Sequence, residues 1–400
     1  MKRSVAYILV SVVVLLLLGA SFAAGVAVSQ VVDFAGLMGI ERPDTELGEQ
    51  VEEVERLLDM QALEPSSEES KTVGAISGLL ESLGDPYAMY FDPEHFAYFN
   101  EQSDGEFFGI GVTIAEREGA VYVVSVIEDT PAEAAGLRAN DEFITIDGVE
   151  RDPWTVDEVV QRVRGPEGTT VQVQMLRPAA EDSATEGELL DFTIERARVE
   201  IPNIESRMEG DDIGYIRLLS FNANAVDDLH DAITSLAEQG AQGYVLDLRD
   251  NPGGLLDASV DAASLFIEDG VIVQVEERYP PTIVHRTTVD KITDAPLVVL
   301  MNNNSASASE VLAGALQDYD RAILVGEQSF GKGSVQTVER LSFGGGVKYT
   351  IAHYLTPTGR VIDGVGLTPD VVVEMEPELQ ADEATDTQMQ RAFEVLRDQL

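Results

Sequence analysis

The second half of the chain alternates between strand-like and helix-like segments, and this alternation constrains the fold more than any other feature. The strand-like runs are GYIRLLSF, GYVLDLR, PLVVLMN and AILVG, and amphipathic segments such as VDDLHDAITSLAEQG and SASEVLAGALQDY separate them. Strands that are joined by crossover helices form parallel sheets with helices on their faces. We therefore expect a multidomain α/β protein whose core, residues 189–375, is a largely parallel βα sheet.

An uncharged run from Ser4 to Val32 follows the basic start MKR. The run is long enough to cross a bilayer, and the positive charges before it favour a cytoplasmic N-terminus. The small-x-small pattern SFA at residues 21–23 offers a signal-peptidase site as the alternative. Residues 1–32 are thus expected to be a single-pass cell-membrane anchor with an extracytoplasmic catalytic part, or a signal peptide whose cleavage gives a secreted protein.

Residues 41–100 are acidic and have a helical pattern. VEEVERLLDMQAL and VGAISGLLESLGD place apolar residues three and four positions apart. The segment DPYAMYFDPEHF then interrupts the helical pattern with Pro86 and Pro93. Such helices pack against the main body or against a second copy, so a homodimer contact is one expectation. A helical tail is expected over residues 376–400.

The charge balance excludes some partners. The chain carries 72 acidic and 26 basic residues, for a formal net charge of -46. Nucleic acid needs a basic footprint and is not an expected partner. A dispersed acidic surface is typical of proteins adapted to high salt, and an acidic secreted enzyme fits equally well. The absence of cysteine excludes a thiol nucleophile and a disulfide framework.

Residues 106–178 have the strand and helix order of a small β-rich module. FFGIGVTI and AVYVVSVI read as strands, TPAEAAGL and TVDEVVQRVRG as helices, and DEFITIDGVE as a hairpin that turns at Asp147-Gly148. This order resembles a PDZ domain. In such domains a glycine-rich loop, here Phe108, Gly109, Ile110 and Gly111, holds the terminal carboxylate of a peptide that adds as a strand. A module that only packs against its neighbours is the alternative. Residues 178–188 read as a polar linker.

Three alternating serines, Ser305, Ser307 and Ser309, fall between the strand PLVVLMN and the helix that follows it. Side chains at such a place project from the carboxyl edge of a parallel sheet. Free N–H groups and the helix dipole there can stabilise an incipient alkoxide. The pattern Ser307-x-x-Glu310 also fits a capping box, so the spacing alone leaves a nucleophile and a helix cap both open.

Lys332 lies between Gly331 and Gly333 in an otherwise uncharged loop, and it is one of only five lysines in the chain. Desolvation lowers the pKa of a lysine and makes a neutral amine available as a general base. Arginine cannot take that role, because it keeps its proton. A surface-loop lysine and a phosphate-binding loop are the alternatives, although the Walker spacing is not met.

The four histidines test competing mechanisms. None of His95, His230, His285 and His353 lies in an H-E-x-x-H motif or in a nucleophile motif. A serine–histidine triad and a zinc protease are therefore disfavoured.

The block NNNSASASEVLAGALQDYDRAILVGEQSFGKGSVQ resembles the active-site block of the carboxyl-terminal processing peptidases, also called tail-specific proteases. The resemblance extends to SGLLESLGDPYAMYF, DLRDNPGG and YLTPTGRVIDGVGLTPD. It implies a crotonase/ClpP-like βα protease core with an inserted PDZ-like domain and an N-terminal helical segment. It also implies a serine endopeptidase that uses neither a metal nor an organic cofactor.

The resemblance assigns roles motif by motif. The middle serine of SASASE, Ser307, matches the nucleophile, and the lysine of FGKG, Lys332, matches the general base. Gly253 of NPGG and the N–H of Ala308 match the oxyanion hole. Gln336 resembles the group that orients the lysine, and Asp318, eleven residues along the helix from Ser307, is the alternative third member.

Three residues of DLRDNPGG have other expected roles. Asp247 and Arg249 are expected to buttress the NPGG turn. Asp250 departs from the family pattern, which often has a second asparagine there.

The expected function is that of a serine endopeptidase that captures accessible protein C-termini through its PDZ-like domain and processes or degrades extracytoplasmic proteins. Two alternatives come from other classes. One is a non-catalytic anchored scaffold that binds protein tails, and the other is a crotonase-type acyl-CoA enzyme with a similar βα core.

Overall fold

The computed structural model describes residues 46–400 apart from positions 118, 152, 180–186, 280, 377–379 and 381–383. The chain divides into two compact units, residues 1–75 and residues 76–400. The expected anchor, residues 1–32, lies outside the described part of the chain. Among the helices that are described, none is both long enough and apolar enough to cross a membrane.

The first unit contains helix α3 (Glu46–Gln61) and the start of helix α4 (Glu68–Glu81). The apolar side chains of α3 follow a helical spacing but lie in solvent; Leu47, Val51, Val54 and Leu58 are each about half exposed. Lys71 lies among three carboxylates, with its Nζ 2.6 Å from Asp59, 2.7 Å from Glu68 and 3.6 Å from Glu55.

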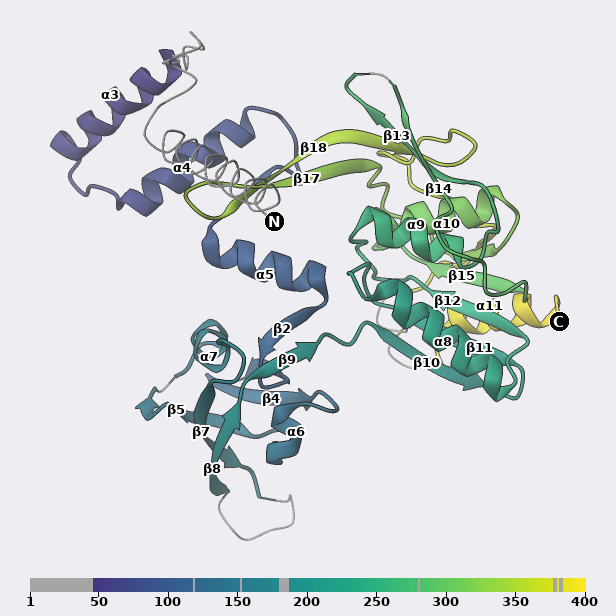
Figure 1. Cartoon of the computed structure of the whole chain (residues 1–400), viewed down its shortest axis with the longest axis horizontal. Coiled ribbons are helices and arrows are strands. Elements are labelled where there is room, and N and C mark those ends of the chain that lie inside the picture. Colours follow the sequence, from purple (N-terminus) through teal and green to yellow (C-terminus); the bar gives the residue numbers. More distant parts are fainter. Residues whose placement is uncertain are drawn as a thin grey trace, which may run out of the picture. The chain divides into compact units, whose positions relative to one another are not determined.

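The core of the second unit is the predicted parallel βα sheet (Figure 1). Its six strands have the order β10 (Ile204–Glu209), β11 (Ile213–Leu218), β12 (Gly243–Asp247), β15 (Leu297–Met301), β16 (Ile323–Gly326) and β19 (Val371–Val372). All neighbouring pairs are parallel except β10–β11, which is antiparallel. The crossover connections carry helices α8 (Ala225–Gln239), α9 (Leu256–Ser264) and α10 (Ala308–Asp318).

Both faces of this sheet are buried, which explains why its strands are apolar without alternation. On one face, residues such as Leu246 and Val299 pack with α8, α9 and α10. On the other face, Val245 and Val298 pack with Phe393 of helix α11 (Thr387–Arg397). In the described part of the expected helical tail, residues 376–400, helix α11 covers a sheet face.

A second sheet is antiparallel. Strand β18 (Gly346–Leu355) pairs with β13 (Val271–Glu277), with β1 (Met89–Phe91) and with β17 (Ser334–Arg340), and β14 (Ile283–Arg286) pairs with β13. Figure 1 shows β17 and β18 as a long ribbon. Helix α5 (Pro93–Asp104) follows β1. Pro93 begins this helix rather than breaking one, because Asp92 accepts hydrogen bonds from the first free amides.

The inserted domain has the predicted order of elements. They are β2 (Glu106–Gly109), β3 (Val112–Arg117), β4 (Ala120–Val126), α6 (Pro131–Ala135), β5 (Glu142–Ile146), β6 (Val149–Glu150), α7 (Val156–Val163), β7 (Thr170–Arg177), β8 (Glu188–Glu195) and β9 (Ala197–Glu200). The β5–β6 hairpin turns at Asp147 and Gly148, both with positive φ, as a two-residue turn requires.

One boundary differs from the sequence-based expectation. Strand β8 pairs with β7 along its whole length, so residues up to Glu195 belong to the inserted domain rather than to a core that starts at residue 189. The sequence does not reveal this boundary, because the polar residues before Glu188 read as a linker between domains. They instead connect two paired strands of one hairpin.

Candidate active site

Ser307 lies at the turn between strand β15 and helix α10. Its backbone has φ 56° and ψ -115°, which is a strained conformation for a residue with a side chain. Its side chain is buried, and it hydrogen-bonds Tyr354 of β18. Burial raises the pKa of Tyr354 to about 12, and the bond with Ser307 opposes that rise. The hydroxyl of Ser307 is therefore held at the place where two sheets meet.

The two flanking serines have structural partners. Ser305 Oγ donates to the Leu248 carbonyl at 2.8 Å, and Ser309 Oγ donates to the Asn251 carbonyl at 3.0 Å. Both hydroxyls thus tie the start of α10 to the DLRDN segment. Only the middle hydroxyl of the three faces a side chain instead of a buried carbonyl.

Glu310 links the turn that carries Ser307 to the loop that carries Lys332. Its fully buried carboxylate accepts hydrogen bonds from the Ser307 amide at 2.9 Å, from Ser329 Oγ, and from the Gly331 and Lys332 amides at 2.8 and 2.9 Å. Burial raises the pKa of Glu310, and these four donors oppose the rise. The helix cap that the Ser-x-x-Glu pattern suggests therefore exists, and the same carboxylate fixes the loop that carries Lys332.

The glycines beside Lys332 are required by close backbone approach. A Cβ on Gly333 would lie 2.1 Å from the Asp363 amide nitrogen, and one on Gly331 would lie 2.9 Å from the Gly366 nitrogen. Gly331 also has a φ of 86°. The loop can take its position only because both neighbours of Lys332 lack side chains.

The amine of Lys332 is half-buried and lies 5.1 Å from the centre of the Tyr87 ring. Among the described residues, no carboxylate forms an ion pair with it, and no hydrogen bond joins it to Ser307. Burial lowers the pKa of Lys332, the charge of Lys348 lowers it further, and Glu310 opposes both effects. Its surroundings thus favour the neutral form of Lys332, and its loop is bound to the Ser307 turn through Glu310.

The turn around Gly253 packs directly against Ser307. A Cβ on Gly253 would lie 2.8 Å from the Ala308 nitrogen and 2.9 Å from Ser307 Cβ, and its φ is 96°. The Ala308 N–H, first in helix α10, has no acceptor within the described residues. The Gly253 N–H, in contrast, donates to Asn251 Oδ1 at 2.9 Å. Of the two expected oxyanion donors, the Ala308 N–H is thus free. The Gly253 N–H has to leave Asn251 before it can bind an oxyanion.

Neither candidate for the third catalytic member hydrogen-bonds Lys332 in the described chain. The Gln336 amide donates to Ser334 Oγ at 2.8 Å, and in the described chain it makes no bond to the lysine. Asp318 lies at the far end of α10, roughly 16 Å along the helix from Ser307. Its carboxylate accepts from the Thr358 amide at 2.8 Å and pairs with Arg360. The structure therefore brings Ser307, Lys332 and Glu310 together and leaves Asp318 outside this group.

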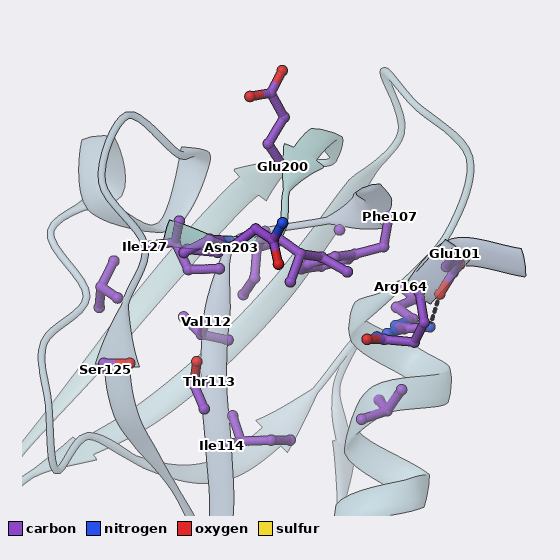
Figure 2. A pocket seen from close by; sticks show the side chains of 18 of the residues that line it. Glu101, Phe107, Val112, Thr113, Ile114, Ser125, Ile127, Arg164, Glu200 and Asn203 are labelled. Carbon is purple, nitrogen blue, oxygen red and sulfur yellow. Dashed lines mark hydrogen bonds and ion pairs between the residues drawn. The ribbon is translucent and has the colours of Figure 1, made fainter. Parts of the chain in front are cut away.

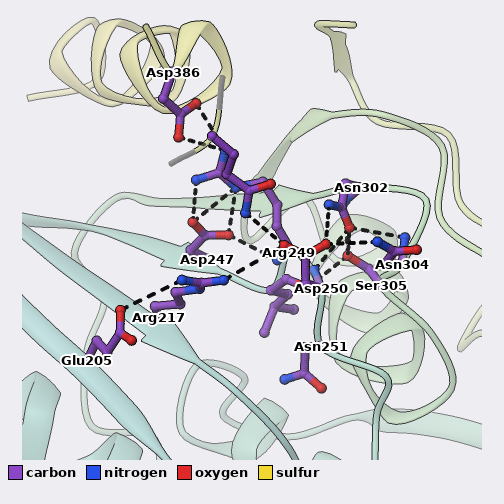
Figure 3. Close-up of polar contacts among 12 residues, drawn as sticks. Glu205, Arg217, Asp247, Arg249, Asp250, Asn251, Asn302, Asn304, Ser305 and Asp386 are labelled. Atoms are coloured by element: carbon purple, nitrogen blue, oxygen red, sulfur yellow. Dashed lines mark hydrogen bonds and ion pairs between the residues drawn. The ribbon is translucent and has the colours of Figure 1, made fainter. Parts of the chain in front are cut away.

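A network of charged and amide side chains lies beside the NPGG turn (Figure 3). Arg249 donates to Asp247 at 2.6 to 3.0 Å and pairs with Asp386, the N-cap of α11, at 2.8 Å. Asp250 accepts from the side-chain amides of Asn302 and Asn304, each at 2.9 Å. Although burial raises the pKa of Asp250, these donors hold it below its ordinary value. The carboxylate of Asp250 thus has hydrogen-bond donors from both asparagines, so this fold accommodates an aspartate at the position where the family often has asparagine.

The inserted domain borders a cavity of about 1750 Å³ (Figure 2). Gly109, Ile110 and Gly111 line it, and the N–H groups of Ile110 and Gly111 have no acceptor in the described part of the chain. The expected Phe108 is not among the lining residues; Phe107 lines the cavity instead. The apolar wall continues along β3 and α7 with Val112, Ile114, Val156, Val159 and Val163.

Comparison with known proteins agrees with this arrangement. Residues 212–373 match peptidase family S41, and residues 109–195 match the PDZ domain. The chain is 38% identical to the carboxyl-terminal-processing protease of Synechocystis sp. over 341 residues. This match covers 83% of this chain and 78% of that protein. The chain belongs to peptidase family S41. It is a carboxyl-terminal processing serine protease with a PDZ domain.

Other S41 relatives give the same assignment. The carboxy-terminal-processing protease of Bartonella bacilliformis is 41% identical over 306 residues, which cover 75% of this chain and 69% of that protein. A solved S41 protease structure from Bacteroides fragilis has a TM-score of 0.51 at 16% identity and covers 90% of this chain and 98% of that one. At that identity it supports the fold alone.

The sequence assigns no site role to three residues that lie around the site of this S41 peptidase. Tyr354 and Lys348 come from β18, whose place beside the site depends on pairing with a strand far away in the chain. Tyr87 belongs to DPYAMYFDPEHF, where Pro86 and Pro93 suggest only an interruption of a helix. Such contacts arise from tertiary structure, so residue spacing does not reveal them.

Proposed function

We propose that this S41 peptidase uses Ser307 as its nucleophile and the neutral amine of Lys332 as its general base. The amine takes the Ser307 proton as the hydroxyl oxygen attacks the scissile carbonyl. The bond to the leaving amine then breaks, with the proton from Lys332, and a water molecule releases the acyl group from Ser307. The Ala308 N–H, joined by Gly253 when it leaves Asn251, stabilises the oxyanion.

Two sets of contacts support this proposal: those of the three serine hydroxyls, and those of Glu310 with the Ser307 and Lys332 amides. The hydroxyls of Ser305 and Ser309 bind buried carbonyl groups, whereas Ser307 faces a tyrosine hydroxyl. Because Glu310 binds the amides of both Ser307 and Lys332, it holds nucleophile and base in one unit. A short movement of the lysine side chain from Tyr87 towards Ser307 would complete the dyad.

Replacement of Ser307 by alanine tests the assignment. We expect Ser307→Ala to abolish cleavage of an unstructured protein substrate, with an unchanged melting temperature. Ser309→Ala is the matched control, because it loses one hydrogen bond to Asn251 and should keep activity at reduced stability. Cleavage by Ser307→Ala at the wild-type rate would contradict the nucleophile assignment.

We further propose that the PDZ domain captures the carboxyl terminus of substrates. The free N–H groups of Ile110 and Gly111 suit a terminal carboxylate, and the apolar wall along Val112 and Val159 suits an apolar tail. Mass spectrometry of cleavage with a free and an amidated version of one peptide tests this. We expect slower cleavage of the amidated form, and equal rates would contradict tail capture.

The substrates are proposed to be extracytoplasmic proteins, because residues 1–32 have the pattern of a membrane anchor. In cells, the full chain should stay in the membrane fraction after alkaline extraction, with its N-terminal residues intact. A chain that lacks residues 2–32 should be found in the soluble fraction. Recovery of the uncleaved full chain in the soluble fraction would exclude the anchor, and a shortened soluble form would indicate the signal peptide.

A homodimer through helix α3 is proposed as well. Its exposed residues Leu47, Val51, Val54 and Leu58 follow the four- and three-residue spacing of a helix-pairing surface. Light scattering should give a dimer mass for the wild type and a monomer mass for Leu58→Glu, while Gln50→Glu remains dimeric. A monomeric wild type would exclude the dimer.

A further inference from the structure

The described lysines fall into two pairs with opposite surroundings. Lys71 and Lys291 each bind carboxylates; for Lys291 the nearest is Asp294, at 2.6 Å. Lys332 and Lys348 have no ion pair anywhere in the described residues. In a chain with 72 acidic residues, two cations that both lack a carboxylate partner require an explanation.

Strand register brings Lys348 close to the catalytic lysine. In an antiparallel pair, directly opposite residues point to the same face of the sheet. Lys348 is opposite Val338 of β17 and opposite Met89 of β1, so these three form one row across the sheet. Gln336 and Thr350 are opposite each other, two positions further along, and they form the next row on the same face.

Tyr87 lies in the turn before β1, close to Thr350, and the catalytic lysine rests on its ring. Asp85 fixes this position, because its carboxylate accepts from the Tyr87 amide at 2.9 Å and from the Thr350 amide at 2.7 Å. The amine of Lys332 lies 5.1 Å from the centre of the Tyr87 ring. Lys348 and Thr350 are two residues apart on one strand, which is about 7 Å. The two lysines therefore lie against neighbouring parts of the same sheet.

The charges around the catalytic lysine come from each neighbouring element. They are Glu310 of α10, Lys348 and His353 of β18, Asp363 of the loop against Gly333, and Asp85 and Tyr87 of the segment before β1. Glu310 already accepts four hydrogen bonds, and Asp363 faces His353 at 3.6 Å. Lys348 is the remaining cation, with its amine 5.5 Å from the Phe91 ring.

We propose that Lys348 keeps the amine of Lys332 neutral by charge repulsion. Lys348 is not catalytic but acts through Lys332, so the proposal rests on the function proposed above. The pKa directions agree with the geometry. After burial, the charge of Lys348 is what lowers the pKa of Lys332. Asp85 opposes the effect of burial on the pKa of Lys348 and so favours the charged form of Lys348.

The rate of cleavage against pH tests this proposal. In the wild type, kcat/KM should rise with pH as Lys332 deprotonates. A unit charge about 7 Å away, at an effective dielectric constant of about 20, changes a pKa by one to two units, and salt reduces this change. We therefore expect Lys348→Met to move the acidic limb up by about one pH unit at low salt, a loss of about tenfold below that limb. High pH should restore the rate.

One further variant makes the prediction specific to charge. Lys348→Arg keeps the cation and should leave the limb in place. A limb that is unchanged in Lys348→Met, or one that moves as far in Lys348→Arg as in Lys348→Met, would overturn the proposal.

A second readout does not depend on catalysis. Trace acetylation with acetic anhydride at each pH, followed by mass spectrometry, gives a titration midpoint for every lysine. In the Ser307→Ala background, Lys348→Met should raise the midpoint of Lys332 by about one unit relative to the Ser307→Ala parent, with Lys291 as the internal reference. An unchanged midpoint overturns the tuning role. A raised midpoint together with normal cleavage by Ser307→Ala would instead overturn the proposed function and leave the tuning intact.

Discussion

Lys71 and Lys332 show two opposite ways to hold a lysine in one acidic chain. Lys71 lies in the first unit among three carboxylates, and its hydrogen bond with Asp59, followed by the one with Glu68, raises its pKa. Lys332 lies in the second unit beside an aromatic ring, and burial lowers its pKa. The same side chain is thus held as a cation in one place and prepared to lose its proton in the other.

The difference shows which surroundings a neutral amine needs in this protein. With a net charge of -46, carboxylates surround most cations by default. The loop around Lys332 avoids them through uncharged residues, through two glycines that allow close packing, and through Glu310, whose oxygens are occupied by four donors. The contrast with Lys71 therefore marks Lys332 as a site with a special environment.

The largest effect is expected from Lys332→Arg. Arginine keeps the positive charge but cannot act as a neutral base, so peptidase activity should fall by about a thousandfold or more. Lys71→Arg is the matched control and should have the wild-type rate. Rates should be measured by mass spectrometry of an unstructured substrate. An active Lys332→Arg variant would remove the distinction between the two lysines.

A smaller effect is expected from Gly333→Ala. The new Cβ would lie 2.1 Å from the Asp363 nitrogen, so the loop has to move and carry Lys332 with it. A displacement of about 1 Å at a catalytic group costs up to about a hundredfold in rate. Gly78→Ala, in helix α4 with open space around it, is the control and should leave kcat unchanged. A wild-type kcat for Gly333→Ala would show that the position of the loop is not critical.

Glu310→Gln should have a moderate effect on both rate and stability. Glutamine keeps one acceptor oxygen, so some of the amide donors from Ser307, Gly331 and Lys332 lose their partner in a buried place. We expect about a tenfold loss of activity and a loss of about 2 kcal/mol in the free energy of unfolding. Urea unfolding, together with the cleavage assay, measures both. Unchanged values would mean that the bridge between nucleophile and lysine loop has no function.

The smallest effect is expected at the other lysine. Asp59→Asn removes the largest cause of the raised pKa of Lys71, so the acetylation midpoint of Lys71 should move down while the cleavage rate stays the same. A change in cleavage rate would show that the surroundings of Lys71 matter for catalysis.

The parallel core follows from the sequence, because each strand and helix there has its own local pattern. Short sequence patterns also predict three local features: the turn before α10, the glycines beside Lys332 and the hairpin at Asp147. The antiparallel sheet is not, because β1, β13, β17 and β18 come from distant segments whose pairing leaves no periodic mark in any one of them. For the same reason the sequence identifies Lys332 as a candidate base but does not reveal Tyr87 or Lys348 beside it.

The central claim is that the amine of Lys332 loses its proton more readily than the amines of Lys71 and Lys291. Titration of each lysine by trace acetylation in the wild-type protein measures this property itself. We expect the midpoint of Lys332 to lie well below those of Lys291 and Lys71, with Lys71 the highest. A midpoint for Lys332 equal to that of Lys71 would contradict the claim.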